Sequence, residues 1–284
     1  MQLRHRFVHP YSPPPPRAGA RGRNRPQRGI APPPLPDEVK SDIYYDIGHP
    51  AGFGGIARLS KHAGSSQKAA KEWLTGQCTY TLHKMARKRY ESRPYKVGGI
   101  NFLWQADLVE MIPYAANNDG MNYMLTVIDV FSRKAWARPI KHKTGQEVKQ
   151  AFESIFQETQ GQLPNKLQTD QGKEFENVTF QSFLKHNNIH FFTIKSHFKA
   201  ALAEWLNYTL KEKLWKYFSH KSTYHWVDVL PKLLYAYNNA HHCSIDMTPA
   251  AVNRENEREL WEAPEAKLPQ NVTQRNQKYA IQSW

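Results

Sequence analysis

Cysteine and long apolar runs are scarce in this sequence. Its two cysteines, Cys78 and Cys243, include no C-x-x-C pair, so neither a disulfide framework nor a cysteine-rich zinc site is indicated. The longest apolar run, Met121 to Phe131, is interrupted by Asp129 and falls far short of the roughly 18 residues that a membrane-spanning helix needs. The first residues lead into proline instead of an apolar segment, so we expect neither a secretion signal nor a membrane span.

Acidic residues are absent from residues 1–36, which hold seven arginines and ten of the nineteen prolines. Such a composition buries too little apolar surface to offset the entropy of ordering, and we predict a disordered Pro/Arg-rich tail over residues 1–40. This segment carries half of the formal charge of +14. The basic stretch 17–28 fits nuclear import or nucleic-acid binding, but it also fits a solvated tail.

The remaining length predicts one large domain with smaller appendages. Residues 41–96 read as a helical module without zinc, residues 97–260 as the main domain, and residues 261–284 as a short polar tail. The basic and aromatic stretch 80–89 contains Lys84 and Arg87. It suits contact with DNA phosphates, although a solvated helix face gives the same pattern.

Strand and helix patterns alternate in the main domain. Helices are expected after Thr144-Gly145, around Phe180 to Leu184 and over 200–218. Three strands, a helix, and then alternating strands and helices predict an α/β domain with a mixed five-stranded sheet flanked by helices. The expected strands cover residues 102–109, 123–131, 135–140, 166–170 and 189–194.

Two acids occupy strand positions that should be apolar. Asp107 lies within Trp-Gln-Ala-Asp-Leu-Val and Asp170 ends Leu-Gln-Thr-Asp. Because a buried, unpaired carboxylate is costly, we expect both to bind a divalent metal such as Mg²⁺, which prefers carboxylate oxygens; loop capping is the alternative. A third acid, Asp129, also interrupts a strand, and we expect it to accept hydrogen bonds from the Ser132-Arg133 turn.

Three phrases resemble the core of retroviral-type integrases, most closely those of Polinton or Maverick transposons. They are Trp104 to Val109, Val127 to Arg133 and Thr169 to Phe175, and the similarity extends over roughly residues 42–260. The resemblance implies an RNase H-like fold and a DDE integrase. Such an enzyme trims the ends of its element and joins their 3′ hydroxyls to target DNA with Mg²⁺ or Mn²⁺.

The resemblance also assigns residues. It implies that Asp107, Asp170 and Glu204 form the catalytic triad that binds the metal. Trp205 and Tyr208 stand where the family phrase has arginines, which supply bidentate phosphate contacts that aromatic side chains lack. Lys213 and Lys216 are expected to face solvent. The residues expected to contact DNA are Asn207, Lys211, Lys84 and Arg87.

The leading hypothesis is therefore a transposon-derived integrase in the nucleus. We expect it to bind element ends and target DNA as a homo-oligomer, without a small-molecule substrate. A catalytically decayed or domesticated DNA-binding protein with the same fold is the alternative. A cellular RNase H or exonuclease would share the carboxylates, but it fits less well with the phrases Lys173-Glu174-Phe175 and Asn207 to Lys211.

Overall fold

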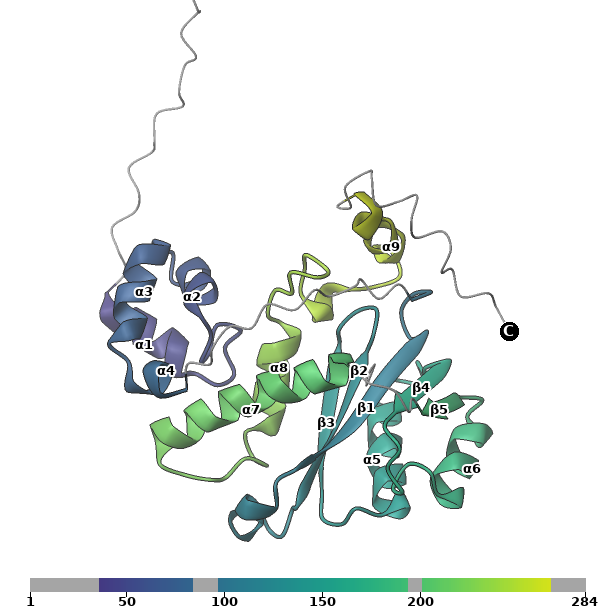
Figure 1. Ribbon diagram of the computed structural model, residues 1–284. Helices are drawn as coiled ribbons and strands as arrows, with labels where there is room; N and C mark the ends of the chain where they lie inside the picture. Colours follow the sequence, from purple (N-terminus) through teal and green to yellow (C-terminus); the bar gives the residue numbers. More distant parts are fainter. Residues whose placement is uncertain (1–35, 84–96, 194–200, 267–284) are drawn as a thin grey trace, which may run out of the picture. The chain divides into compact units, whose positions relative to one another are not determined.

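A mixed five-stranded sheet forms the centre of the computed structural model, which describes residues 36–83, 97–193 and 201–266 (Figure 1). The strand order is β3-β2-β1-β4-β5. The strands are β1 (Leu103–Glu110), β2 (Tyr123–Asp129), β3 (Ala135–Ile140), β4 (Lys166–Thr169) and β5 (His190–Thr193).

Strand pairing changes direction at the centre of the sheet. Strand β1 pairs antiparallel with β2 and parallel with β4, while β3 and β5 form the edges. The first three strands follow one another directly, whereas α5 and α6 intervene before β4 and β5, as parallel crossovers require. The predicted RNase H-like α/β fold with a mixed five-stranded sheet is confirmed.

Helices cover both faces of the sheet because alternate residues of each strand point to opposite sides. On one face, Trp104 and Leu167 pack with Phe152 of α5 (Gly145–Glu158) and Phe180 of α6 (Val178–His186). The other face packs against α7 (Ala201–Lys221) and α8 (Leu230–Asn238). Helix α5 begins where the sequence predicted it, after the Thr144 side chain, which accepts a hydrogen bond from the backbone N–H of Glu147 and so caps the helix.

Four short helices precede the sheet. Tyr44, Leu59 and Leu74 from these helices belong to the same apolar cluster as Leu214 and Phe218 of α7, so the second half of α7 is covered by them. These helices are α1 (Asp37–Tyr45), α2 (Ile56–His62), α3 (Gln67–Thr75) and α4 (Cys78–Leu82).

Two lysines of α7 are buried beneath this N-terminal part. The side-chain amine of Lys213 lies 2.6 Å from the carbonyl oxygen of Gly52, and that of Lys216 lies 3.0 Å from the carbonyl oxygen of Phe53. Both residues are 3% exposed or less. The prediction that they face solvent was wrong, because their amines satisfy backbone carbonyls of the segment between α1 and α2.

Two predicted segment boundaries, at residues 40 and 260, differ from the ends of the helices in the structure. Helix α1 begins at Asp37, inside the stretch assigned to the tail, and the rest of that stretch lies outside the described residues. Helix α9 (Glu257–Ala266) continues past residue 260 into the predicted polar tail. Two short 3₁₀ helices complete the described elements, at Ile112–Asn117 and Pro249–Ala251. Among the helices described, none has the length and apolar character needed to cross a bilayer.

Burial of Lys213 predicts a pH-dependent stability. Desolvation, together with the nearby Arg58 and Lys216 charges and against Glu212, lowers the pKa of Lys213 to about 7. The unfolded chain keeps this proton up to the ordinary lysine pKa of about 10.5. The penalty for burying the charge is therefore fully present below pH 7 and fades towards pH 10, so stability rises with pH in this window.

Lys213→Met should remove this contribution. Urea unfolding at pH 7 and pH 9.5 should show that the free energy of unfolding of the wild type rises relative to that of the variant. The matched control is Lys221→Met, on the exposed end of the same helix. Parallel changes in all three proteins would contradict the assigned pKa.

Candidate active site

The sheet register places Asp107 next to Asp170. Gln105 of β1 and Gln168 of β4 are paired in parallel register, and the two aspartates follow two residues further along each chain. Because residues two apart in a strand point to the same face and neighbouring strands lie about 4.8 Å apart, the sheet brings the carboxylates together. Asp107 is half-buried, while Asp170 is exposed just beyond the end of β4.

Gln105 and Gln168 connect the sheet to the start of α7 through hydrogen bonds. The Gln105 amide donates to the side-chain oxygen of Gln168 at 3.1 Å. The Gln105 side-chain oxygen accepts from the backbone N–H groups of Leu202 and Ala203, at 3.1 and 3.3 Å. These are first-turn donors of α7 without partners within the helix, so Gln105 holds the start of α7 over β1.

One turn further, Asn207 connects α7 to Asp107. Its amide nitrogen donates to Asp107 Oδ2 at 2.7 Å, and its Oδ1 accepts from the Thr126 hydroxyl at 2.6 Å. Asn207 is only 8% exposed. Its predicted contact with DNA is therefore replaced by a positioning role, because both ends of the amide are used inside the protein.

Gln105, Gln168 and Thr126 are site residues that the sequence motifs did not indicate. A signal for the glutamines was present: each lies two residues before an aspartate, on the face of the strand that carries the acid. Thr126 became apparent only from the β1–β2 register, which places it opposite Asp107.

The carboxylates influence one another electrostatically. Burial, then the Asp107 charge and then the Glu174 charge raise the pKa of Asp170, while Lys143 opposes them. Glu174 is itself buried and pairs with the Lys143 amine at 3.1 Å. Two mutually repelling carboxylates with one nearby cation are suited to a divalent metal, which relieves the repulsion and takes oxygen ligands.

Glu204 lies apart from the two aspartates. It is exposed on the first turn of α7, and the described residues contain no cluster of three His, Cys, Asp or Glu side chains arranged to hold a metal. The structure thus brings together two members of the predicted triad. Glu204 remains their neighbour through Asn207, one helical turn along α7.

The other predicted DNA contacts fall in different places. Lys211 is half-buried on α7, whereas Lys84 and Arg87 lie outside the described residues.

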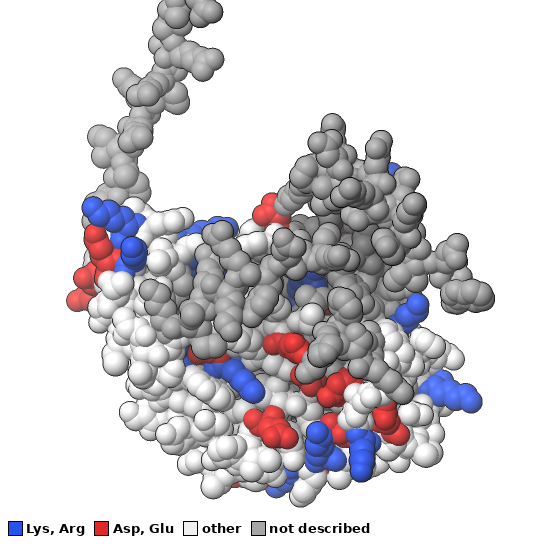
Figure 2. Space-filling model, in the orientation of Figure 1, with Lys and Arg blue, Asp and Glu red and all other residues white. Residues whose placement is uncertain are grey.

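Figure 2 shows several acidic side chains close together over the sheet, with lysines and arginines at their margin.

Asp129 has the structural role that the sequence predicted. Its Oδ2 accepts from the backbone N–H of Ser132 at 2.9 Å and from the Ser132 hydroxyl at 2.5 Å. These bonds hold the turn between β2 and β3, in which Arg133 has a φ of 63°. Asp129 therefore stabilises a turn.

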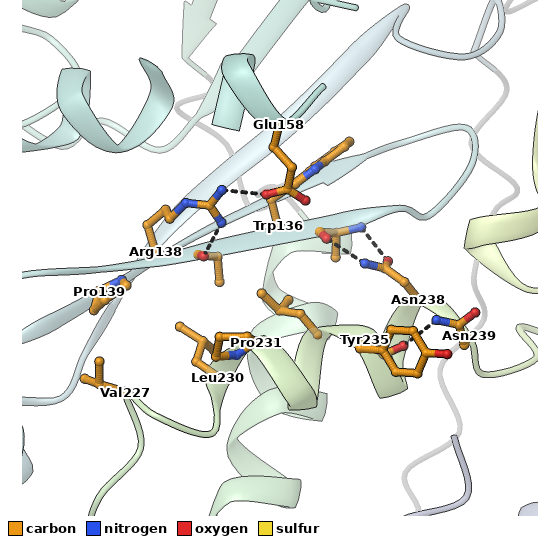
Figure 3. Close-up of a pocket in the computed structure, with 13 residues that line it drawn as sticks. Trp136, Arg138, Pro139, Glu158, Val227, Leu230, Pro231, Tyr235, Asn238 and Asn239 are labelled. Atoms are coloured by element: carbon orange, nitrogen blue, oxygen red, sulfur yellow. Dashed lines mark hydrogen bonds and ion pairs between the residues drawn. The ribbon is translucent and has the colours of Figure 1, made fainter. Parts of the chain in front are cut away.

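A separate pocket of about 510 Å³ lies between β3 and α8 (Figure 3). Leu230 and Tyr235 contribute to its mostly apolar wall, and the Arg138–Glu158 ion pair crosses one side. None of the three predicted acids lines it. The carboxylate site is therefore separate from this cavity.

Part of this chain matches a known protein family. Residues 100–197, which include Asp107 and Asp170, match the family described as "Integrase core domain". These residues are therefore similar to an integrase core domain. Glu204 lies just beyond the matched residues, on α7.

Two curated proteins are similar to about half of this chain. A transposon-derived protein of Caenorhabditis elegans is 37% identical over 144 residues, covering 51% of this chain and 50% of the worm protein. The Pol polyprotein of a radiation murine leukemia virus is 33% identical over 142 residues, covering 48% of this chain and 23% of the polyprotein. The chain thus spans half or less of the length of these relatives.

Two solved structures share a more distant likeness. The simian T-cell lymphotropic virus intasome in complex with the PP2A regulatory subunit B56 gamma gives a TM-score of 0.49 at 21% identity, covering 78% of this chain and 76% of the matched chain. The HTLV-2 integrase catalytic core domain in complex with magnesium gives 0.44 at 23% identity, covering 53% and 94%.

Removing the Asn207 amide should destabilise the integrase core. Asn207→Leu leaves the Thr126 hydroxyl and one Asp107 oxygen without this partner, a loss of about 1–3 kcal/mol in the free energy of unfolding. Urea titration measures it. Adding Thr126→Val should cost less in this background than in the wild type; additive losses would show that the pair does not interact.

The coupling between the aspartates should be visible in a titration. Asp107→Asn removes the second-largest cause of the raised pKa of Asp170, so that pKa should fall towards its ordinary value. Carboxyl-carbon NMR of Asp170 measures the change without added metal. Lys149→Met, on the exposed side of α5, serves as a control, and an unchanged pKa in Asp107→Asn would place the carboxylates too far apart to interact.

Proposed function

We propose that this chain is a transposon-derived integrase that trims DNA ends and joins them to target DNA. The observation that carries the proposal is that Asp107 and Asp170 each follow two residues after the paired Gln105 and Gln168, within the residues that match the integrase core family. The similarity to a transposon-derived protein supports the origin.

The two aspartates supply hard oxygen ligands, and their electrostatic coupling fits Mg²⁺ or Mn²⁺. When bound, the metal supplies activation of the attacking oxygen and neutralisation of the leaving oxygen in phosphodiester chemistry. Asp107 and Asp170 would hold it, with Glu204 as the proposed third acid. Asn207 keeps one Asp107 oxygen directed towards α7.

Other residues position the DNA in this proposal. Lys211 lies two helical turns from Glu204 on the same side of α7 and would meet the phosphate backbone, as would Lys84 and Arg87. Joining two ends to one target needs more than one active site, so we propose a homo-oligomer. Because the proposed substrates are DNA, we propose that the protein acts in the nucleus.

A second candidate is a DNA-binding protein that has lost the chemistry. Glu204 is not gathered with the two aspartates in the described part of the chain, and Trp205 and Tyr208 replace arginines of the family phrase. A domesticated protein of this kind would keep the fold and the basic stretches of the sequence while failing to cut or join DNA.

A strand-transfer assay separates the two candidates. Labelled duplex oligonucleotides and a supercoiled plasmid are incubated with the wild type, Asp107→Asn, or Trp205→Arg combined with Tyr208→Arg, in Mg²⁺, Mn²⁺ or EDTA. We expect metal-dependent joining by the wild type and none by Asp107→Asn, because that change removes a metal-binding carboxylate.

If the wild type does not join DNA, the variant with both arginines restored distinguishes the two candidates. Joining that arises only after restoration identifies a decayed integrase, and the absence of metal-dependent joining in both backgrounds would overturn the enzymatic function.

A further inference from the structure

Two large aromatic side chains lie exposed on the first half of α7. Trp205 is 66% exposed and Tyr208 37% exposed. Their ring centroids are 5.8 Å apart and their planes meet at 71°. The opposite side of the same helical segment is buried through Leu206 and Leu210, so these rings belong to its solvent-facing stripe.

Such a pair is unusual on a surface that water covers. Exposed apolar residues are common one at a time, but adjacent ones mark places where a ligand or partner binds. An edge-to-face arrangement uses at most one face of one ring. Trp205 therefore keeps most of its indole surface available for contact.

The position of the pair narrows the choice of ligand. Trp205 and Tyr208 flank Asn207, whose amide is bonded to Asp107 at 2.7 Å, and Lys211 follows one turn after Tyr208. A ligand that lies along the solvent-facing side of these turns of α7 meets flat rings first and a cation next. An unpaired nucleobase joined to its phosphate has this combination of groups.

We propose that Trp205 and Tyr208 form a stacking platform for an unpaired base of the DNA strand presented to Asp107 and Asp170. The proposal rests on the proposed function and deepens it by naming the bound form of the substrate as an unpaired strand end. In this chain, stacking on the aromatic rings positions the strand. The family phrase has arginines at these two positions, and arginines would bind the phosphates instead.

Stacking should strengthen the binding of DNA that carries unpaired ends, measured as a lower Kd. Stacking of one base corresponds to a change in Kd on the order of 5- to 100-fold. Loss of the rings should therefore weaken binding to a duplex with a three-nucleotide overhang and leave binding to a blunt duplex nearly unchanged.

Fluorescence of 2-aminopurine in the overhang tests the platform directly, because stacking quenches this base. The full-length wild type should quench it on binding. Trp205→Phe should retain most of the quenching, whereas Trp205→Leu, which is apolar but not aromatic, should lose it. The matched control is Tyr235→Ala: Tyr235 is 63% exposed on α8, and its loss should change nothing.

Three outcomes would overturn the proposal, and they are distinguishable. Equal quenching and equal anisotropy-measured affinity for wild type and Trp205→Leu would remove the stacking role while leaving DNA binding intact. Unchanged DNA binding with a smaller particle in sedimentation of Trp205→Leu would assign the rings to contact with a second copy of the chain. Absence of DNA binding by the wild type would contradict the proposed function itself.

Discussion

The hydrogen bond between the Asn207 amide and Asp107 Oδ2 joins the central strand of the sheet to α7. It depends on the Thr126 hydroxyl, which engages the other end of the amide, and on Gln105, which holds the start of the helix. These bonds fix the first turns of α7, which carry Glu204 and the two exposed rings, over the central strand. Further along, Lys213 and Lys216 attach the same helix to the N-terminal part through backbone carbonyls.

Much of the fold could be predicted because its signals are local. Strand β3 begins and ends where the sequence predicted a short edge strand, and the Thr144 cap marked the start of α5. The burial of Lys213 and Lys216 could not be predicted in this way. Their partners lie about 160 positions earlier in the chain, and a lysine pattern on a helix indicates solvent unless distant carbonyls are known to be available.

In the site too, residues with local signals could be predicted, whereas residues whose partners lie far away in the sequence could not. Asp107 and Asp170 were identifiable as acids in apolar strands, and the parallel register explains why they meet. Asn207 was expected to contact DNA because it belongs to the phrase that resembles the integrase family. The structure buries it, since Asp107 and Thr126, both far away in the sequence, provide an acceptor and a donor for its amide. Pairing across the sheet was needed to correct this role.

We propose that Asp107 of β1 and Asp170, just after β4, together bind a divalent metal. Anomalous diffraction from crystals grown with Mn²⁺ tests it most directly, with Asp107→Asn crystals grown in the same way for comparison. We expect an Mn²⁺ peak bound by oxygens of both aspartates in the wild type and loss of that peak in the variant. A well-ordered site without the peak, or a peak that persists after the substitution, would contradict it.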